Sequence, residues 1–126
     1  MDNEAFDVLC KKIEQKIKAY HFIISDKEFI PAAEFGDFQI LFSNGIYSFK
    51  LVNDTGKYFL HTKGRNADWH LITDFIDKHY PDSTLGLDMK AKNLYKSDFS
   101  LETTFNFIGK SLTLITSHYQ LGFNPE

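Results

Sequence analysis

The chain has 126 residues, of which 43% are apolar and 25% are charged, and its formal net charge is −3 at pH 7. This length is typical of one domain, and the apolar fraction is sufficient to bury a core, so we expect a single globular domain over residues 1–126. The mildly negative charge argues against a general nucleic-acid-binding protein, because phosphate contacts require a concentrated surface of Lys and Arg.

The N-terminus and the single cysteine indicate the cellular compartment. The start, Met1-Asp2-Asn3-Glu4, is acidic, unlike a secretory signal with its basic start and uninterrupted apolar stretch. No segment approaches the roughly 20 apolar residues of a membrane span. Cys10 is the only cysteine, which excludes an intrachain disulfide and suits a buried thiol in a reducing compartment. We therefore expect a cytoplasmic protein that binds neither membrane nor nucleic acid.

The first predicted element is a long amphipathic helix that starts at Asp2 or Asn3. Apolar side chains recur there at three- and four-residue steps, with polar residues between them. The apolar series is Phe6, Leu9, Ile13, Ile17, Tyr20 and Ile24. Residues 25–36 follow neither a helical nor a strand period and contain Pro31, so we interpret them as a connector with at most a short extended piece around Phe29.

The clearest local pattern is a β-hairpin around Asn44-Gly45, because this dipeptide between alternating apolar runs is a strong hairpin signal. The flanking strands are predicted at residues 37–42 and 46–52. A two-residue turn places the apolar side chains of both strands on one face of the sheet. The predicted pairs are Phe42 with Tyr47, Ile40 with Phe49, and Phe38 with Leu51.

A second turn at Asn53-Asp54-Thr55-Gly56 predicts a type I turn with Gly56 in the left-handed region, followed by a third strand at residues 57–63. A three-residue loop gives the pairs Leu51–Phe59 and Phe49–His61, whereas a four-residue loop exchanges the two faces of the third strand. Apolar residues on both sides of this strand predict that each face of the sheet is at least partly covered.

Helices are predicted in the second half of the chain. Asp68 caps a helix that ends at Pro81, and its apolar stripe is Trp69, Ile72, Phe75, Ile76 and Tyr80. Residues 83–96 hold a short helix or none. Ser100 caps a final helix that Gly122 terminates, with the stripe Leu101, Phe105, Ile108, Leu112, Ile115 and Tyr119.

These elements together predict an α+β fold: a long N-terminal helix, an antiparallel β-meander of three or more strands, and two or three amphipathic helices packed on the sheet.

Two polar motifs could in principle bind a metal ion or a phosphate group. His70 and Asp74, with Asp77 following, are spaced to face one way on the predicted second helix, but without a cysteine partner they are more typical of a solvated helix face. Gly109-Lys110-Ser111 resembles the end of a phosphate-binding loop, yet it lies in a helical pattern and lacks the earlier glycine. We therefore expect no metal and no other cofactor.

His61 is the one histidine predicted among apolar side chains, where burial would lower its pKa and a partner would fix its tautomer. Such a residue can act as a general base. It is more often a core or rim histidine satisfied by one hydrogen bond.

The order of the elements, and the run Leu51-Val52-Asn53-Asp54-Thr55-Gly56-Lys57-Tyr58-Phe59 followed by Trp69, resembles small bacterial immunity proteins of polymorphic-toxin systems. Those proteins bind and block a cognate toxin. In that family an Asp-basic-Gly turn joins two strands, and here Thr55 replaces the basic residue. The resemblance implies a non-enzymatic protein that acts through surface complementarity, and it carries no catalytic residues with it.

Two functions remain open at this point. The first is a protein-binding module, an immunity-type inhibitor of a toxin-like partner, with a candidate acidic surface at Asp68, Asp74, Asp77 and Asp82 that would suit a nuclease. The alternative is a small-ligand-binding or catalytic domain with an aromatic pocket lined by His61, Phe49 and Phe59. A homodimer formed through exposed apolar surface is a third hypothesis.

Overall fold

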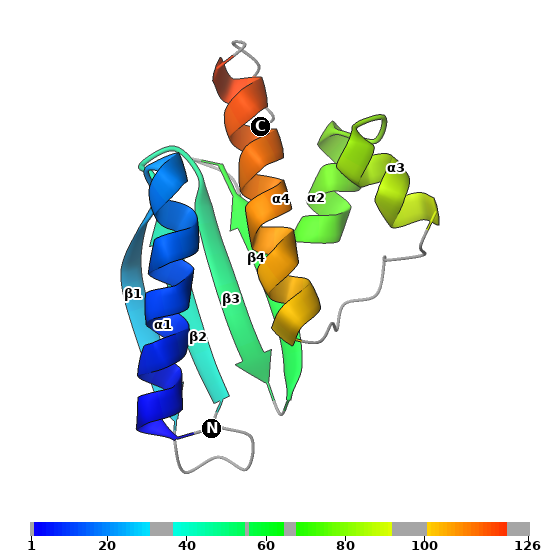
Figure 1. Ribbon diagram of the computed structural model, residues 1–126. Helices are drawn as coiled ribbons and strands as arrows, with labels where there is room; N and C mark the ends of the chain where they lie inside the picture. The colour runs from blue at the N-terminus through cyan, green and yellow to red at the C-terminus, as the bar shows by residue number, and fades with distance from the viewer. Residues whose placement is uncertain (1, 31–36, 55, 65–67, 92–100, 121–126) are drawn as a thin grey trace.

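The computed structural model describes residues 2–30, 37–54, 56–64, 68–91 and 101–120. A five-stranded antiparallel sheet, with its strands in the order β1-β2-β3-β4-β5, carries helices that precede and follow it in the chain (Figure 1). The elements are α1 (Asn3–Ile17), the 3₁₀ helix η1 (Lys18–Tyr20), β1 (Ile23–Ile30), β2 (Asp37–Ser43), β3 (Ser48–Asp54), β4 (Lys57–Lys63), β5 (His70–Leu71), α2 (Ile72–His79), α3 (Thr84–Ala91) and α4 (Leu101–Gln120). This arrangement confirms the predicted α+β class.

The first helix begins where the sequence predicts, because Asp2 caps it. The Asp2 carboxylate accepts a hydrogen bond from the backbone N–H of Ala5 at 2.8 Å. The helix ends earlier than predicted, since η1 follows it and His21 then adopts a left-handed conformation with φ of 63°. Ile24, which was predicted to extend the helix, therefore lies in a strand.

β1 is a full strand where the sequence predicted a connector. It pairs antiparallel with β2 and contains a bulge between Ile24 and Asp26. Most of its side chains are exposed, and only Ile24 and Phe29 pack partly against the core. An edge strand with a bulge and few buried side chains lacks the alternation by which strands are predicted, which is why the pattern was missed.

The predicted hairpin forms at Asn44-Gly45, but the predicted residue pairs are wrong by two positions. Asn44 Oδ1 accepts hydrogen bonds from the backbone N–H groups of Ile46 and Tyr47, at 2.9 and 2.8 Å. These bonds close a four-residue loop, so the strands start pairing at Ser43 and Ser48. The observed pairs are Phe42–Phe49, Ile40–Leu51 and Phe38–Asn53. Because the shift is even, each side chain keeps its predicted face.

The turn between β3 and β4 is shorter than predicted. Asp54 pairs with Lys57, so residues 55 and 56 alone connect the two strands. The buried Asn53 side chain accepts a hydrogen bond from the Gly56 N–H at 3.0 Å. Gly56 has φ of 84°, the left-handed conformation predicted for it, which a residue with a side chain rarely adopts.

This one-residue difference exchanges the two faces of β4 relative to the preferred prediction. Phe49 lies opposite Thr62 rather than His61, and Leu60 rather than Phe59 takes the core position. Leu60 and Thr62 are fully buried, whereas Phe59 and His61 are half-buried on the other face. An odd register shift has this effect because successive side chains of a strand point to opposite faces.

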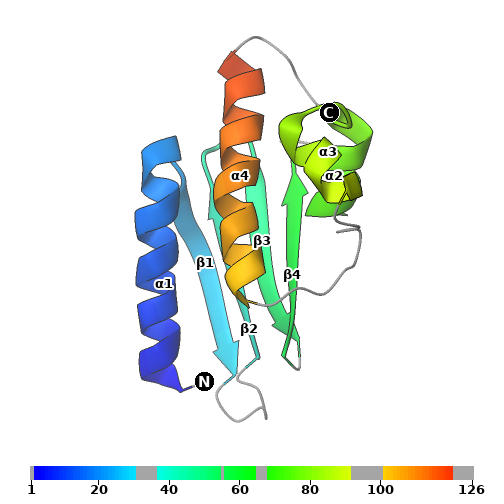
Figure 2. The same ribbon diagram turned by 45° about the vertical axis from the view of Figure 1, so that its right-hand side comes forward.

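The helices cover one face of the sheet. In Figure 1 and Figure 2, α1 lies over β1 and β2, α4 lies over β3 and β4, and α2 and α3 stand beside α4. Phe42 stacks on Phe49 with ring centroids 5.3 Å apart, and Phe22 of the α1–β1 connection packs edge-on against both rings. No described helix covers the opposite face, although side chains there such as Leu41, Phe59 and His61 are half-buried.

The helices after the sheet follow the predicted order, but the first of them starts later than predicted. His70 and Leu71 form β5, so α2 begins at Ile72 and Asp68 is not its cap. Residues 84–91 form α3, whose start is capped by the Ser83 hydroxyl, which accepts a hydrogen bond from the Gly86 N–H at 3.0 Å. The predicted cap Ser100 and terminator Gly122 of α4 lie outside the described residues. None of the described helices is both long and apolar enough to cross a membrane.

Gly86 and Gly109 provide a matched test of this packing, since both lie inside helices. A Cβ at Gly86 would stand 2.5 Å from the Tyr80 carbonyl oxygen and 2.8 Å from that of Pro81, whereas at Gly109 it would meet only the flexible end of Lys16. We expect G86A to lower the free energy of unfolding by about 1–3 kcal/mol despite the better helix propensity of alanine. G109A should be neutral, or stabilising by up to about 1 kcal/mol. Urea unfolding measures both changes, and equal effects at the two positions would contradict the packing.

Candidate binding surfaces

The four acidic residues predicted to bind a partner are all exposed, but they belong to separate segments. Asp74 and Asp77 lie one turn apart on α2, Asp68 precedes β5, and Asp82 lies between α2 and α3. Asp82 also lines a hollow of about 370 Å³ formed by residues 79–83. Of the four, therefore, only Asp74 and Asp77 share one face of a helix.

The two polar motifs do not form sites. His70 lies in β5 and Asp74 lies on α2, so the predicted spacing on one helix does not exist. Within the described part of the chain, no group of three or more His, Cys, Asp or Glu side chains could hold a metal ion. Gly109-Lys110-Ser111 lies inside α4, as its helical pattern indicates. Cys10 is buried, and burial raises the pKa of its thiol.

The predicted aromatic pocket does not assemble, because its three residues lie on both sides of the sheet. Phe49 is fully buried under the helices, whereas Phe59 and His61 lie on the other face with their rings 6.5 Å apart. His61 Nδ1 is buried and has no hydrogen-bond partner among the described residues. Burial, and then the neighbouring Lys50 ammonium, lower the pKa of His61. The imidazole is therefore mainly neutral at pH 7.

The face of the sheet that no described helix covers is called the open face. Leu41, Lys50, His61 and Leu71 lie side by side across four of its strands. Trp69 lies at one corner, where the ammonium nitrogens of Lys50 and Lys63 are 4.6 and 5.0 Å from its ring centroid. Half-buried aromatic, aliphatic and basic side chains thus occupy the β3–β4–β5 part of this face.

The other part of the open face is acidic. Register with β2 places Asp26 and Glu28 of β1 on this face, opposite Leu41 and Gln39. A hollow of about 260 Å³ lies at this end, and Glu28 is among its lining residues together with Asp37 and Asp54. Carboxylates of β1, β2 and β3 therefore gather at this end of the open face, where Asp54 lies directly opposite Lys57 of β4.

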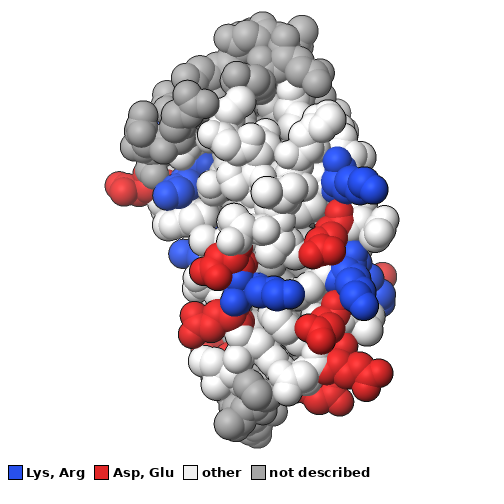
Figure 3. All heavy atoms as spheres, turned by 90° about the vertical axis from the view of Figure 1, so that its left-hand side faces the viewer, with Lys and Arg blue, Asp and Glu red and all other residues white. Residues whose placement is uncertain are grey.

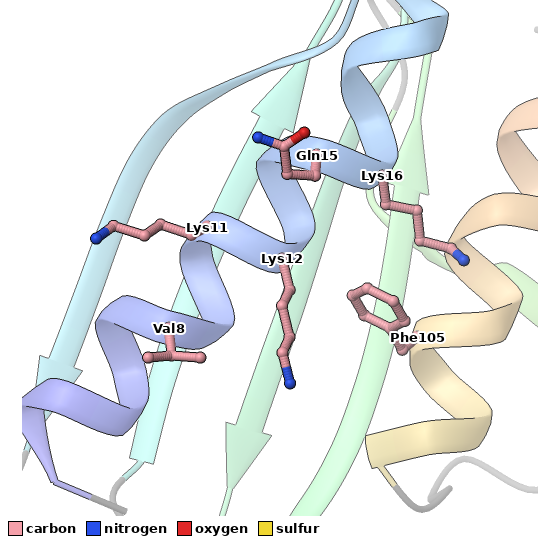
Figure 4. A pocket seen from close by; sticks show the side chains of 6 residues that line it. All are labelled: Val8, Lys11, Lys12, Gln15, Lys16 and Phe105. Atoms are coloured by element: carbon pink, nitrogen blue, oxygen red, sulfur yellow. The ribbon is translucent and has the colours of Figure 1, made fainter.

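A second surface lies on the helical side of the molecule, in a shallow groove of about 530 Å³ between α1 and α4 (Figure 4). Its lining residues are Val8, Lys11, Lys12, Gln15 and Lys16 of α1 and Phe105 of α4. Lys16 and Phe105 reach toward each other across the groove, with the Lys16 ammonium nitrogen 4.7 Å from the ring centroid. Val8 is 47% exposed. The groove therefore combines apolar side chains with three lysines, and none of its described lining residues is a carboxylate.

Sequence reasoning missed both surfaces for identifiable reasons. Val8 is an apolar residue on the otherwise polar side of α1, and this exception to the pattern is a signal for the groove. Phe105 was assigned to the apolar stripe of the last helix, and it is only half-buried there. Trp69 was placed on a helix, and its position over Lys50 and Lys63 depends on β5, a two-residue strand too short to show a period.

The position of His61 on the open face predicts its titration. We expect an NMR titration to give His61 a pKa below its ordinary value of 6.5. K50M should raise that pKa, but only in part, because burial is the larger cause. The unfolded chain then binds the proton more readily than the folded chain, so stability present above about pH 6.5 is lost as the pH falls below it. An unchanged His61 titration in K50M would show that the two side chains do not interact.

Comparison with known proteins gives no relative from which a function could be transferred. No protein-family model matches the sequence, and neither the curated proteins nor the solved structures provide a significant match. The geometry of the groove and of the open face is therefore the basis for a functional proposal.

Proposed function

We propose that this protein is a non-enzymatic protein-binding module, an immunity-type inhibitor that blocks a toxin-like protein partner. The observation that carries the proposal is the groove between α1 and α4, in which three lysines surround exposed apolar groups. On a chain with a net charge of −3, a groove whose described lining residues include three lysines and no carboxylate is a local reversal of sign. Such a surface favours a partner that is both apolar and acidic.

The shape of the groove supports a protein segment as the occupant. It is shallow and open along two neighbouring helices, as grooves that receive an amphipathic segment are. An apolar side chain of the partner would pack against Val8 and Phe105, and carboxylates beside it would meet Lys12 and Lys16. A small ligand normally requires a more enclosed site that buries most of its surface.

The surroundings of His61 support a non-enzymatic function. A general base needs a reacting group within hydrogen-bond reach, and usually a third group that orients it. The neighbours of His61 across the sheet are Lys50 and Leu71, and its ring neighbour is Phe59. Leu71 and Phe59 are apolar, and the Lys50 ammonium lies over the Trp69 ring, so none of these three neighbours is a carboxylate that could orient the imidazole.

The α1–α4 groove and the exposed carboxylates of α2 favour partners of opposite charge. The groove suits an acidic segment, whereas Asp74 and Asp77 would suit the basic surface of a nuclease. Charge reversal at each surface therefore distinguishes the two modes of binding.

The test uses a partner captured on the immobilised wild-type protein, identified, and then purified for calorimetry. K12E/K16E should weaken its affinity by about tenfold or more, because two charge pairs in the groove become repulsive. K18E/K110E changes the net charge equally at exposed lysines outside the groove and should have little effect. V8D tests the apolar part of the same groove and should also weaken binding.

Three outcomes decide between the proposals. Loss of affinity in K12E/K16E and V8D, with D74K/D77K unchanged, supports binding in the groove. Loss in D74K/D77K alone would move the interface to α2. Inhibition is tested separately, by co-expressing the chain with the captured partner and measuring growth. A partner that is harmless to the cell, or equally toxic with and without the chain, would contradict the inhibitor function.

A further inference from the structure

We infer that the occupant of the α1–α4 groove is an amphipathic helix with two carboxylates one turn apart, and that Gly109 shapes the groove for it by letting Lys16 lie across α4. The inference rests on the proposed function, since it names the class of segment that the inhibitor would bind on its partner. It is argued from the register of α1 and α4, from the position of the Lys16 side chain, and from the nature of the groove walls.

α1 and α4 run in the same direction, and two contacts fix their register (Figure 1). The hydroxyl groups of Tyr20, in η1 at the end of α1, and of Thr113 share a hydrogen bond of 2.6 Å. One turn earlier on both helices, Lys16 lies against Gly109, where a Cβ would stand 2.8 Å from Cε of the lysine. Both contacts join residues 93 positions apart, so the two helices stay in step along the groove.

Gly109 gives the Lys16 side chain a place on the surface of α4. The missing Cβ leaves room for the end of the lysine, whose ammonium nitrogen lies 4.7 Å from the ring centroid of Phe105, one turn earlier on α4 (Figure 4). A glycine inside a helix lowers its stability relative to alanine, and here Lys16 uses the space that it leaves. The ammonium is thus held in the groove before a partner arrives, which reduces the entropy that the side chain loses on binding.

The charges of α1 are sorted by side. Lys12 and Lys16 lie one turn apart and line the groove, whereas the charges of Asp7 and Glu14 act on the Cys10 thiol, on the side of β1. Figure 3, which views the molecule from the side of α1 and β1, shows acidic and basic side chains close together there. Four residues of a helix rise about 6 Å, so carboxylates four residues apart on a partner helix match the two lysines of the groove.

The walls of the groove favour a helix over an extended segment. On α1 the lining residues run from Val8 to Lys16, a length of about 12 Å along the helix axis. Both walls are helices, whose backbone N–H and C=O groups bond within each helix. An extended segment would turn some of its own backbone groups toward Val8 and Phe105, where they would lack partners, whereas a helix bonds its backbone internally. The occupant would therefore lie as a third helix on the α1–α4 pair.

Fluorescence anisotropy with designed peptides tests the inference on the full-length chain, without the natural partner. The probe is a labelled Ala/Gln-based peptide of about 18 residues, long enough to be helical in water. It carries two glutamates four residues apart, flanked by two leucines, all on one face of the helix. One control peptide has a glutamate moved by two residues to the opposite face, and another has a central proline that breaks the helix.

The wild type should bind the probe, and added salt should weaken the binding. Both control peptides should bind at least about tenfold more weakly, because one loses a charge pair and the other loses the helix. K12E/K16E should abolish binding of the probe, which locates it in the groove.

G109A tests the role of the glycine separately from the stability of the fold. Alanine should displace Lys16 from α4 and weaken the probe about threefold or more, with no loss of stability in urea unfolding. N106A, at an exposed position of α4 outside the groove, should leave the affinity unchanged. K16M should weaken the probe about tenfold, and G109A should then add no further effect in the double variant, because both changes act through the same ammonium.

The outcomes separate this inference from the proposed function. A probe that does not bind, or that binds no better than the two control peptides, would overturn the helical occupant, even where the captured partner still depends on Lys12 and Val8. An affinity in G109A equal to that of the wild type would overturn the role of Gly109. A captured partner that is insensitive to K12E/K16E, with the probe binding as expected, would instead contradict the proposed function.

Discussion

Asp54 pairs with Lys57 across the turn between β3 and β4, and this register decides which side of the sheet each residue of β4 occupies. The buried Asn53 side chain holds the turn by accepting a hydrogen bond from Gly56. A loop longer by one residue would move Leu60 to the open face and His61 to the face under the helices. Burial among apolar side chains there would disfavour the protonated imidazole. The separation of a core face from an open face therefore depends on two connecting residues.

That separation gives the molecule two unlike surfaces. On the helical side, α1 and α4 pack on the sheet through side chains such as Ile13 and Ile108, which are fully buried, and they leave Val8 and Phe105 accessible between them. On the open side, aromatic and basic side chains contact one another instead of a covering helix, as Trp69 and Lys50 do. Among the described residues, the cross-strand and ring neighbours of the half-buried His61 include no carboxylate. Both surfaces have the mixture of apolar and charged groups that suits recognition of another protein.

The sequence predicted those elements that bury one regular face. The apolar series of α1, the alternation in β2 and β3, and the stripe of α4 each follow the period of their element, and all four appear in the structure. β1 and β5 were missed because an exposed edge strand and a two-residue strand have no such period. The residues of β4 do not show which of its side chains point toward the helices, because Phe59 and Leu60 are both apolar. The length of the preceding turn determines this. The exposed Val8 on α1 was a hint of the groove, but its second wall could not be predicted, because that requires knowing that Phe105 of α4 lies beside Lys16 of α1.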